Sequence, residues 1–382
     1  MFLHTTQARN PELLETAGYF HRKGLISPNT YVIDYDAVQK NARKIAVEAS
    51  RQGVECYFMT KQIGRNPLLA HGIMEAGLQK AVAVDPWEAR VLGKHGIPIG
   101  HVGHLVQIPQ HMMKEMLSLS PEVVTVFSYE NAKVVSQAAM SLGYSQDILL
   151  RVVDRSDFLY PGQKGGIFLD ALEEEIQKIA ALPGVHIKGA TNFPCLLVKQ
   201  GKVEPTQNFK TLQQAGRILK ERGFHDLQIN TPSATSTTTL PLIKEMGGTQ
   251  GEPGHALTGT TPLHAQTEQP EIPAMVYVSE ISHLFDGYAH VFGGGFYPRS
   301  HVHHALVGRP GHWKEVDVIA NEPGSIDYYG TLATDEASVG DTVLYAFRTQ
   351  IFVTNAQVAV VSGIGHHPQL LGLFDSQGQK LI

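Results

Sequence analysis

The sequence predicts an α/β fold, in which a (β/α)8 TIM-type barrel is followed by a C-terminal antiparallel β domain. Strand-like and helix-like segments alternate over the first two thirds of the chain, a pattern that indicates a parallel sheet covered by helices. Between Val54 and Glu252 there are eight strand-like segments, and eight is the number that closes such a barrel. An open doubly wound sheet is the alternative, but no G-x-G-x-x-G dinucleotide motif follows the first of these strands.

Each element follows from its local pattern. A helix is expected at Pro11–Arg22 and a first strand at Tyr31–Asp34. Apolar, β-branched runs predict the barrel strands Val54–Thr60, Ala81–Asp85, Ile99–Leu105, Val123–Ser128, Ile148–Val153, Val185–Phe193, Leu227–Thr231 and Gly248–Glu252. Apolar residues at helical spacing predict the helices Asp36–Arg51, Pro86–His95, Asp170–Ala181 and Phe209–Gly223. The second begins with an Asp-Pro pair suited to an N-cap, and the last ends at a glycine suited to a C-cap.

The pattern changes near Pro270. Beyond it, short β-rich segments separated by Gly, Pro and Asp predict an antiparallel β domain, with strands at Ala274–Ser279, Ala289–Phe292, Thr342–Phe352 and Val358–Gly363. The segment Thr260–Pro273, rich in Thr, Gln and Pro, is the expected link. We therefore predict an N-terminal helical extension over residues 1–30, a barrel over 31–265 and a β domain over 266–382.

Composition excludes several classes of function. The chain has 382 residues, is 42% hydrophobic and carries a net charge of −5, whereas a nucleic-acid-binding protein needs a basic face. No apolar run approaches the ~20 residues of a membrane helix, and the start shows no signal-peptide pattern. The two cysteines, Cys56 and Cys195, suggest no disulfide framework, so we expect a cytoplasmic protein.

Lys61 is the first candidate catalytic residue, because it directly follows the predicted core strand Val54–Thr60. A lysine that is desolvated at the end of such a strand has a lowered pKa and a nucleophilic amine. That chemistry suits a Schiff base with pyridoxal phosphate. Taken alone the pattern is weak, since most lysines after strands extend into water.

In a barrel the active site lies at the carboxyl ends of the strands. The polar residues found there form one convergent set: Lys61, Arg65, Asp85, His104, Arg151 to Asp157, Asn192, Ser233 to Ser236, and Glu252 to His255. The turns after the seventh and eighth strands could together hold a phosphate through backbone N–H groups and hydroxyls. For the Ser-Ala-Thr-Ser turn, a plain helix N-cap is the alternative.

The order of these motifs resembles the fold-type III pyridoxal phosphate enzymes, the group of alanine racemase and ornithine decarboxylase. The matching residues are Lys61, Asn192-Phe193-Pro194, the Pro-Ser-Ala-Thr run at 232–235 and the Glu-Pro-Gly run at 252–254. Within that group the chain is similar to the YhfX family over essentially its whole length, through MTKQ, GHLVQIP, DFLYPGQ, PSATS, EPGHALTG, SEISH and FRTQIFVT. The resemblance implies the same barrel and β domain, and a homodimer whose active site is shared between two subunits.

The resemblance also implies roles for individual residues. Lys61 would hold pyridoxal 5'-phosphate as a Schiff base and act as a base on the substrate Cα. Ser233, with the backbone of Gly254 and His255, would hold the phosphate, and Arg65 would help through its guanidinium. Glu252 would face the pyridine nitrogen and favour its protonated form, as in the decarboxylases, whereas alanine racemases have an Arg there. His104, Asn192 and Thr235 complete the expected cofactor site.

Three departures from the family pattern leave the reaction open, two for a racemase and one for a decarboxylase. Racemases use a Tyr from the partner's β domain as a second base, but here Phe292 falls at that position. We expect Tyr297 to substitute, with a nearby His as the alternative. At the sixth strand the family often shows Thr-His-Phe, whereas this chain has Thr191-Asn192-Phe193. Decarboxylases carry a β-domain Cys that protonates the product, and both cysteines here lie in the barrel portion.

Two further clusters were considered. His301 and His303 would face one side of a strand and, with His304, could bind a metal, but no Cys or Asp stands beside them, so we expect no metal site. Arg348 could bind a substrate carboxylate or form a structural salt bridge.

The sequence thus predicts a pyridoxal phosphate-dependent enzyme that acts on an amino acid or related amine and abstracts a Cα proton, most simply a racemase-like isomerase. The alternatives are a fold-type III decarboxylase, a D-amino-acid aldolase or dehydratase, or a non-catalytic cofactor-binding protein. A barrel enzyme that uses Lys61 on a sugar or keto acid without pyridoxal phosphate is a further alternative. No nucleic-acid or membrane partner is expected.

Overall fold

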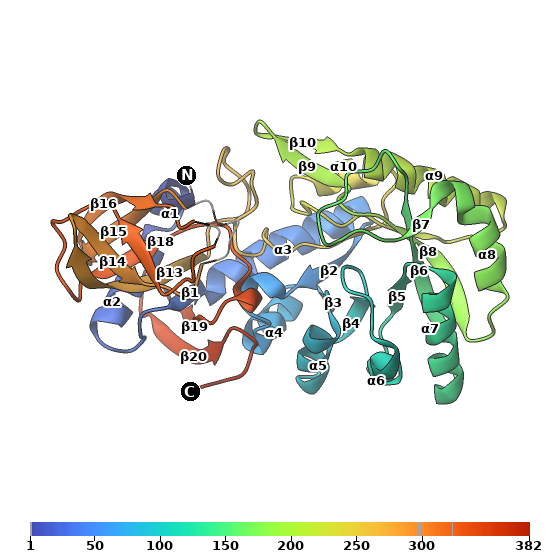
Figure 1. The fold of residues 1–382 in the computed structure, drawn as a ribbon, viewed down its shortest axis with the longest axis horizontal. Helices are drawn as coiled ribbons and strands as arrows, with labels where there is room; N and C mark the ends of the chain where they lie inside the picture. Colours follow the sequence, from blue (N-terminus) through green and yellow to red (C-terminus); the bar gives the residue numbers. More distant parts are fainter. Residues whose placement is uncertain (1, 297–299, 301, 323) are drawn as a thin grey trace. The chain divides into compact units, whose positions relative to one another are not determined.

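The computed structural model describes residues 2–296, 300, 302–322 and 324–382, which divide into two compact units (Figure 1). One unit, here called the barrel unit, comprises residues 44–60 and 77–254. The other, here called the β unit, comprises residues 1–43, 61–76 and 255–382. The chain therefore passes between the units several times, and helix α3 (Tyr35–Gln52) begins in one and ends in the other.

The barrel unit contains a closed parallel sheet of eight strands, which confirms the predicted barrel. The ring closes because β5 pairs with both β4 and β6, and because β12 pairs with both β2 and β11. In ring order the strands are β2 (Glu55–Met59), β3 (Lys80–Ala83), β4 (Ile99–Val102), β5 (Val123–Val126), β6 (Gln146–Val153), β8 (Val185–Thr191), β11 (Gln228–Asn230) and β12 (Gln250–Gly251). The short β7 (Ile167–Phe168) adds to β6 alone.

Two helices of the barrel unit, α5 and α7, begin at side-chain caps. Asp85 caps α5 by accepting a hydrogen bond from the N–H of Glu88, with Pro86 in the first turn. Ser128 caps α7 in the same way, and Gly143 ends it with φ of 81°. The helices are α5 (Pro86–Lys94), α6 (Met113–Ser118), α7 (Tyr129–Leu142), α8 (Leu172–Ala180), α9 (Gln207–Glu221) and α10 (Leu240–Glu245), with 3-10 turns η2 (Gln110–Met112) and η3 (Leu169–Ala171).

Polar side chains close the amino end of the barrel. Lys80 forms ion pairs with Glu55 and Glu122, and Glu122 also accepts hydrogen bonds from Tyr57 and Gln228. Glu55, Lys80 and Gln228 are the first residues of their strands. Glu122 directly precedes β5, and Tyr57 is the third residue of β2. Polar layers at this end of a barrel serve stability, whereas active sites of barrel enzymes lie at the opposite, carboxyl end.

The β unit contains one nine-stranded sheet. Six antiparallel strands within it close on themselves in the order β13, β14, β17, β16, β15 and β18, while β1, β19 and β20 extend the sheet from β13. Their bounds are β1 (Thr30–Asp34), β13 (Met275–Phe285), β14 (Tyr288–Phe292), β15 (His304–Arg309), β16 (His312–Ile319), β17 (Tyr329–Leu332), β18 (Thr342–Tyr345), β19 (Gln357–Ser362) and β20 (Gln369–Asp375).

Three details of this unit differ from the pattern in the sequence. The first predicted strand, β1, lies in this sheet, antiparallel to β13 and parallel to β19. The strand predicted over Thr342–Phe352 ends at Tyr345, and the chain then reaches the 3-10 helix η4 (Ile351–Val353). The segment Thr260–Pro273 is packed rather than linker-like, with His264 and Glu271 buried beside each other.

The N-terminal helices complete the β unit. Helices α1 (Phe2–Arg9) and α2 (Pro11–Arg22) place Leu13, Leu14 and Phe20 in one apolar cluster with strand residues such as Val276 and Leu344. The burial of these side chains is the main driving force for that packing. The unit also contains η1 (Lys61–Ile63) and α4 (Pro67–Glu75). In the described part of the chain, no helix is long and apolar enough to span a bilayer.

Closure of the barrel depends on a glycine. A Cβ at Gly189 on β8 would lie 1.9 Å from the carbonyl oxygen of Gln228 on β11, and backbone atoms cannot move aside cheaply. We expect Gly189→Ala to lower the free energy of unfolding by at least about 3 kcal/mol, measured by denaturant unfolding. Gly324→Ala, whose Cβ would meet no atom within 4 Å, is the matched control. Equal stability of the two variants would contradict this packing.

Candidate active site at the carboxyl end of the barrel

A hydrogen-bonded chain of polar side chains crosses the interior of the barrel. His101 lies at its centre, with Nδ1 2.7 Å from Glu252 Oε1 and Nε2 2.6 Å from the hydroxyl of Thr125. Asn230 donates to the same carboxylate oxygen at 3.0 Å and accepts from the hydroxyl of Thr191 at 2.7 Å. Five strands or strand ends thus contribute to one buried network, here called the Glu252 network.

The Glu252 network lies at the carboxyl ends of the strands. Thr191 and Asn230 are the last residues of β8 and β11, and Glu252 directly follows β12. All five side chains are at most 3% exposed. Polar groups at this end of a parallel barrel mark the catalytic face.

Glu252 is held as a carboxylate. Burial by itself raises its pKa, but the electrostatic attraction of His104 and His101 and the hydrogen bonds from His101 and Asn230 outweigh burial and lower the pKa to about 2. The second oxygen, Oε2, lies 3.7 Å from His104 Nε2 and accepts no hydrogen bond from any residue that the structure describes. The carboxylate therefore retains one buried acceptor for an N–H donor.

The same three side chains could be considered as metal ligands. One ligand atom from each of His101, His104 and Glu252 lies within 4.8 Å of the others. However, both ring nitrogens of His101 are already at hydrogen-bond distance from Glu252 and Thr125. A metal would need to displace one of these bonds. The distances fit a hydrogen-bonded network better than a coordination shell.

A strained turn precedes Glu252 in the barrel. Ser233 and Ala234 have φ of 109° and 51°, values that residues other than glycine rarely adopt. The hydroxyl of Thr235 then accepts the backbone N–H of Glu252 at 3.0 Å, which ties the turn to the backbone of Glu252. The hydroxyl of Ser233 donates to the carbonyl of Leu196 at 2.6 Å. An anion at this turn would therefore meet backbone N–H groups more readily than the Ser233 hydroxyl.

Asn192 organises the neighbouring turn. Its amide donates to Asp157 and to the carbonyl of Asn208, and its oxygen accepts from Phe193 N–H. This places the Phe193 ring against His104, with ring centres 5.6 Å apart. The turn leads into a hairpin of β9 (Leu196–Lys199) and β10 (Lys202–Pro205), which the sequence pattern did not reveal.

In the β unit, Lys61 begins η1, one residue after Thr60 of the barrel unit. Burial and the charges of Arg348, Lys61 and His264 lower the pKa of His255 well below its ordinary value. His255 is thus neutral at pH 7 in a region of positive potential, and its Nε2 has no hydrogen-bond partner within the described residues. Such a region favours an anionic ligand.

The remaining predicted site residues are placed as follows. Arg65 is buried in the β unit, where it donates to Gln377 at 2.7 Å and lies 5.0 Å from the Phe352 ring. Gly254 is buried at the end of the Glu-Pro-Gly run. Tyr297 and His301 lie outside the described residues. His303 directly precedes β15, and His304, the first residue of that strand, pairs with Asp317.

Sequence reasoning missed most of the Glu252 network. His101, Thr125, Thr191 and Asn230 lie within strands, whereas the prediction was confined to residues that follow strands. The available signal was a polar side chain inside an apolar strand, as in Ile-Gly-His-Val and Val-Val-Thr-Val.

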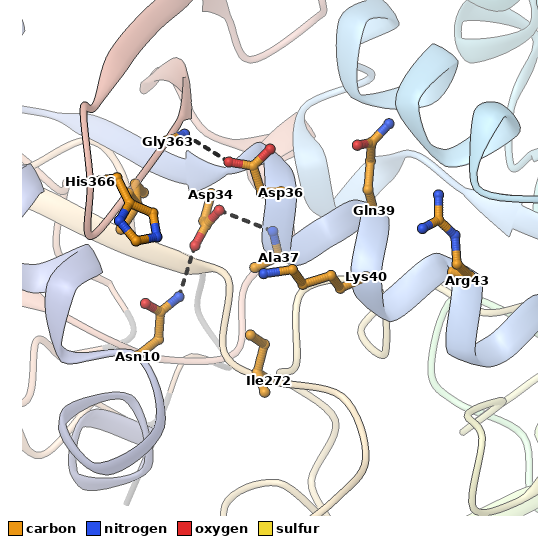
Figure 2. A pocket seen from close by; sticks show the side chains of 11 residues that line it. Asn10, Asp34, Asp36, Ala37, Gln39, Lys40, Arg43, Ile272, Gly363 and His366 are labelled. Atoms are coloured by element: carbon orange, nitrogen blue, oxygen red, sulfur yellow. Dashed lines mark hydrogen bonds between the residues drawn. The ribbon is translucent and has the colours of Figure 1, made fainter.

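The β unit also contains a pocket of about 360 Å³ that includes none of the predicted site residues. Figure 2 shows Asp34, Asp36, Lys40 and His366 around it, where β1 gives way to α3. Asp34 accepts from the N–H of Ala37 and from Asn10, and Asp36 accepts from the N–H of Gly363 (Figure 2). The two carboxylates therefore serve as structural hydrogen-bond acceptors that join β1 and α3 to neighbouring segments, and we propose no catalytic role for this pocket.

Comparison with known proteins identifies the family. Residues 33–262 match the alanine racemase N-terminal domain, and residues 276–370 match the YhfX-like C-terminal domain. The chain is also 45% identical, over the full length of both proteins, to the uncharacterized protein YhfX of Escherichia coli (strain K12). The chain belongs to the YhfX family.

Solved structures share the fold of this YhfX-family chain. D-threonine aldolase from Filomicrobium marinum has a TM-score of 0.68, 15% identity, and coverage of 93% of this chain and 96% of its own. D-threo-3-hydroxyaspartate dehydratase from Delftia sp. HT23 has a TM-score of 0.68 and 15% identity, and the match covers 92% of this chain and 97% of the dehydratase. Alanine racemase from Clostridium difficile 630 in complex with cycloserine has a TM-score of 0.65 and 15% identity, and the match covers 91% of this chain and 98% of the racemase. These likenesses show an alanine racemase-like fold that serves several reactions.

The strained turn generates a prediction about stability. Ala234→Gly should raise the free energy of unfolding by about 1 kcal/mol, because glycine adopts φ of 51° without steric cost. Ala138→Gly in α7 is the control and should lower it by about 1 kcal/mol. Denaturant unfolding measures both. A loss of stability in Ala234→Gly would show that the turn is unstrained.

The lowered pKa of Glu252 generates a prediction about acid stability. Its folded-state pKa of about 2 is below the ordinary 4.5, so its contribution to stability is present above pH 4.5 and is lost as pH falls from 4.5 toward 2. The contribution at neutral pH is on the order of 3 kcal/mol, at about 1.4 kcal/mol for each pKa unit. Denaturant unfolding at several pH values should show a wild-type stability that falls more steeply in this window than that of Glu252→Gln. Parallel curves would contradict the assignment.

Proposed function

We propose that this chain is a pyridoxal 5'-phosphate-dependent enzyme that acts on an amino acid or related amine and abstracts a proton from its Cα. The observation that carries the proposal is Glu252, a fully buried carboxylate with one oxygen left to accept a hydrogen bond. A buried anion of this kind matches a protonated ring nitrogen and would hold the proton on it. When bound, the cofactor supplies an electron sink for a carbanion at Cα.

The other residues of the barrel fit the same cofactor. The turn at Ser233 and Ala234, where both residues have positive φ, would offer its backbone N–H groups to a phosphate. Phe193 and His104 form an aromatic corner that a planar ring could pack against. The Glu252 network fixes the carboxylate, so its orientation would be set before any ligand binds.

Lys61 is the residue that we propose holds the cofactor covalently. It directly follows Thr60, whose hydroxyl bonds to the buried Glu88 of the barrel unit. Its ε-amine would then take a proton from the substrate Cα or return one to it. Lys61 and Arg348 are among the positive charges that lower the pKa of His255, and such charges would suit the anionic groups of cofactor and substrate.

The reaction that we propose first is racemase-like proton transfer, with Lys61 on one face of Cα and Tyr297 on the other. The resemblance to alanine racemase supports this assignment, and Phe292 cannot serve because it carries no proton. A homodimer in which the β unit of one copy completes the site of the other is part of the same proposal. The solved aldolase and dehydratase of similar fold carry the alternatives of aldol cleavage and elimination.

Cofactor binding tests the proposal directly. Wild-type protein mixed with pyridoxal phosphate should develop a visible absorption band, and borohydride followed by peptide mass spectrometry should find the label on Lys61. Lys61→Ala should lose both signals, whereas Lys114→Ala, which removes an exposed lysine, should retain them. Labelling of several lysines at similar levels, or none, would contradict the assignment of Lys61.

Exchange of the Cα hydrogen separates an enzyme from a non-catalytic binding protein. Amino acids incubated with the loaded protein in D2O should lose their Cα proton signal in NMR spectra, and Lys61→Ala should abolish this exchange. Cofactor labelling without exchange across the common L- and D-amino acids would favour a binding role. Exchange without inversion would favour aldol cleavage or elimination over racemisation.

A further inference from the structure

The pocket beside the start of α3 is separate from the Glu252 network. Its volume of about 360 Å³ lies within the range of small-molecule sites, and every residue that lines it belongs to the β unit (Figure 2). The residues of the Glu252 network all belong to the barrel unit. A ligand of this pocket would therefore add to the proposed function and would not depend on it.

Helix α3 places opposite charges along one side of this pocket. Asp36, Lys40 and Arg43 all line it, and they follow one another at i, i+4 and i+7, the spacing of one helix face. At a rise of about 1.5 Å per residue, Asp36 and Arg43 are about 10 Å apart along the helix axis. Long side chains on a helix point back toward its N-terminus, so the Arg43 side chain shortens this distance.

Two of the charged groups in the pocket offset each other. Asp34 is 6% exposed, and its carboxylate accepts hydrogen bonds from the N–H of Ala37 and the amide of Asn10, each at 3.0 Å. Lys40 extends along α3 toward Asp34 (Figure 2). Burial raises the pKa of Asp34, and the positive charge of Lys40 opposes that rise. The charges that are not offset in this way are those of Asp36 and Arg43.

Asp36 and Arg43 both retain atoms that a ligand can use. Asp36 accepts the N–H of Gly363 at 2.7 Å through one oxygen, Oδ2, whereas Oδ1 accepts no hydrogen bond from any residue that the structure describes. Arg43 is exposed, and its guanidinium forms no hydrogen bond or ion pair within the described ranges. The pocket thus offers one anionic acceptor and one cationic donor.

A ligand with one charge of each sign matches this arrangement. An anion alone would face Asp36, and a cation alone would face Arg43. We propose that the pocket binds a free α-amino acid as a zwitterion, with its ammonium on Asp36 and its carboxylate on Arg43. A guanidinium suits a carboxylate because it can donate two parallel hydrogen bonds. Ile272 and Ile364 also line the pocket and would pack against an aliphatic side chain of the ligand.

Calorimetric titration with matched ligands tests the requirement for both charges. The probes are L- and D-valine, 3-methylbutanoate, which lacks the ammonium, and 2-methylpropylamine, which lacks the carboxylate. At least one enantiomer of valine should bind. Each analogue should bind at least about 10-fold more weakly, because it leaves one charge of the pocket unmatched.

Substitutions in the pocket test its location. The titrations use Lys61→Ala protein without pyridoxal phosphate, so that no Schiff base forms at the proposed catalytic lysine. In that protein, Asp36→Asn keeps an oxygen for the N–H of Gly363, and Arg43→Gln changes an exposed side chain. Each should weaken valine binding about 10-fold or more. Arg217→Gln, which changes an exposed arginine on α9, is the matched control and should leave binding unchanged.

The outcomes separate this proposal from the proposed function. Failure of wild-type protein to bind pyridoxal phosphate would contradict the proposed function and would leave these titrations unaffected. No binding of either valine, equal binding of the single-charge analogues, or unchanged binding in a folded Asp36→Asn or Arg43→Gln variant would overturn the proposal. If Asp36→Asn unfolds, Arg43→Gln alone decides.

Discussion

The polar interior of the barrel depends on the hydrogen bonds that the buried carboxylate of Glu252 accepts. An ionised group with 0% side-chain exposure is costly unless its charge and its lone pairs are matched. His101 and Asn230 provide hydrogen bonds, while Thr125 and Thr191 satisfy the far sides of those two residues. Five strands or strand ends are thereby held in register by one charge.

The two polar layers of the barrel differ in how completely they are satisfied. At the amino end, Lys80 lies between Glu55 and Glu122, so cation and anion neutralise each other. At the carboxyl end, Glu252 keeps an oxygen without a donor and Arg151 keeps nitrogens without an acceptor among the described residues. The charged groups of the first layer satisfy one another, whereas those of the second layer keep unsatisfied atoms that lower stability. Such a difference is usual between a structural layer and a binding site.

Much of the architecture could be predicted from the sequence, because strand and helix periodicities are local. The eight barrel strands and helix α2 fall where the pattern places them. The sheet that β1 joins could not be predicted, since Tyr31–Asp34 looks like any buried strand and its partners β13 and β19 are distant in sequence. Within the site, Glu252 was found from its Glu-Pro-Gly run. Its partners His101 and Asn230 needed the three-dimensional register, and Arg151 was selected only as part of a longer loop.

The protonation state of the cofactor ring nitrogen tests the central claim most directly. Protein loaded with pyridoxal phosphate labelled with 15N in the ring would be examined by NMR at pH 8, as wild type and as Glu252→Gln. We expect the wild-type nitrogen to show the chemical shift of a protonated pyridinium, and the variant to show that of a neutral pyridine. A neutral nitrogen in wild type, or no change on replacement of Glu252, would contradict the role of this buried carboxylate.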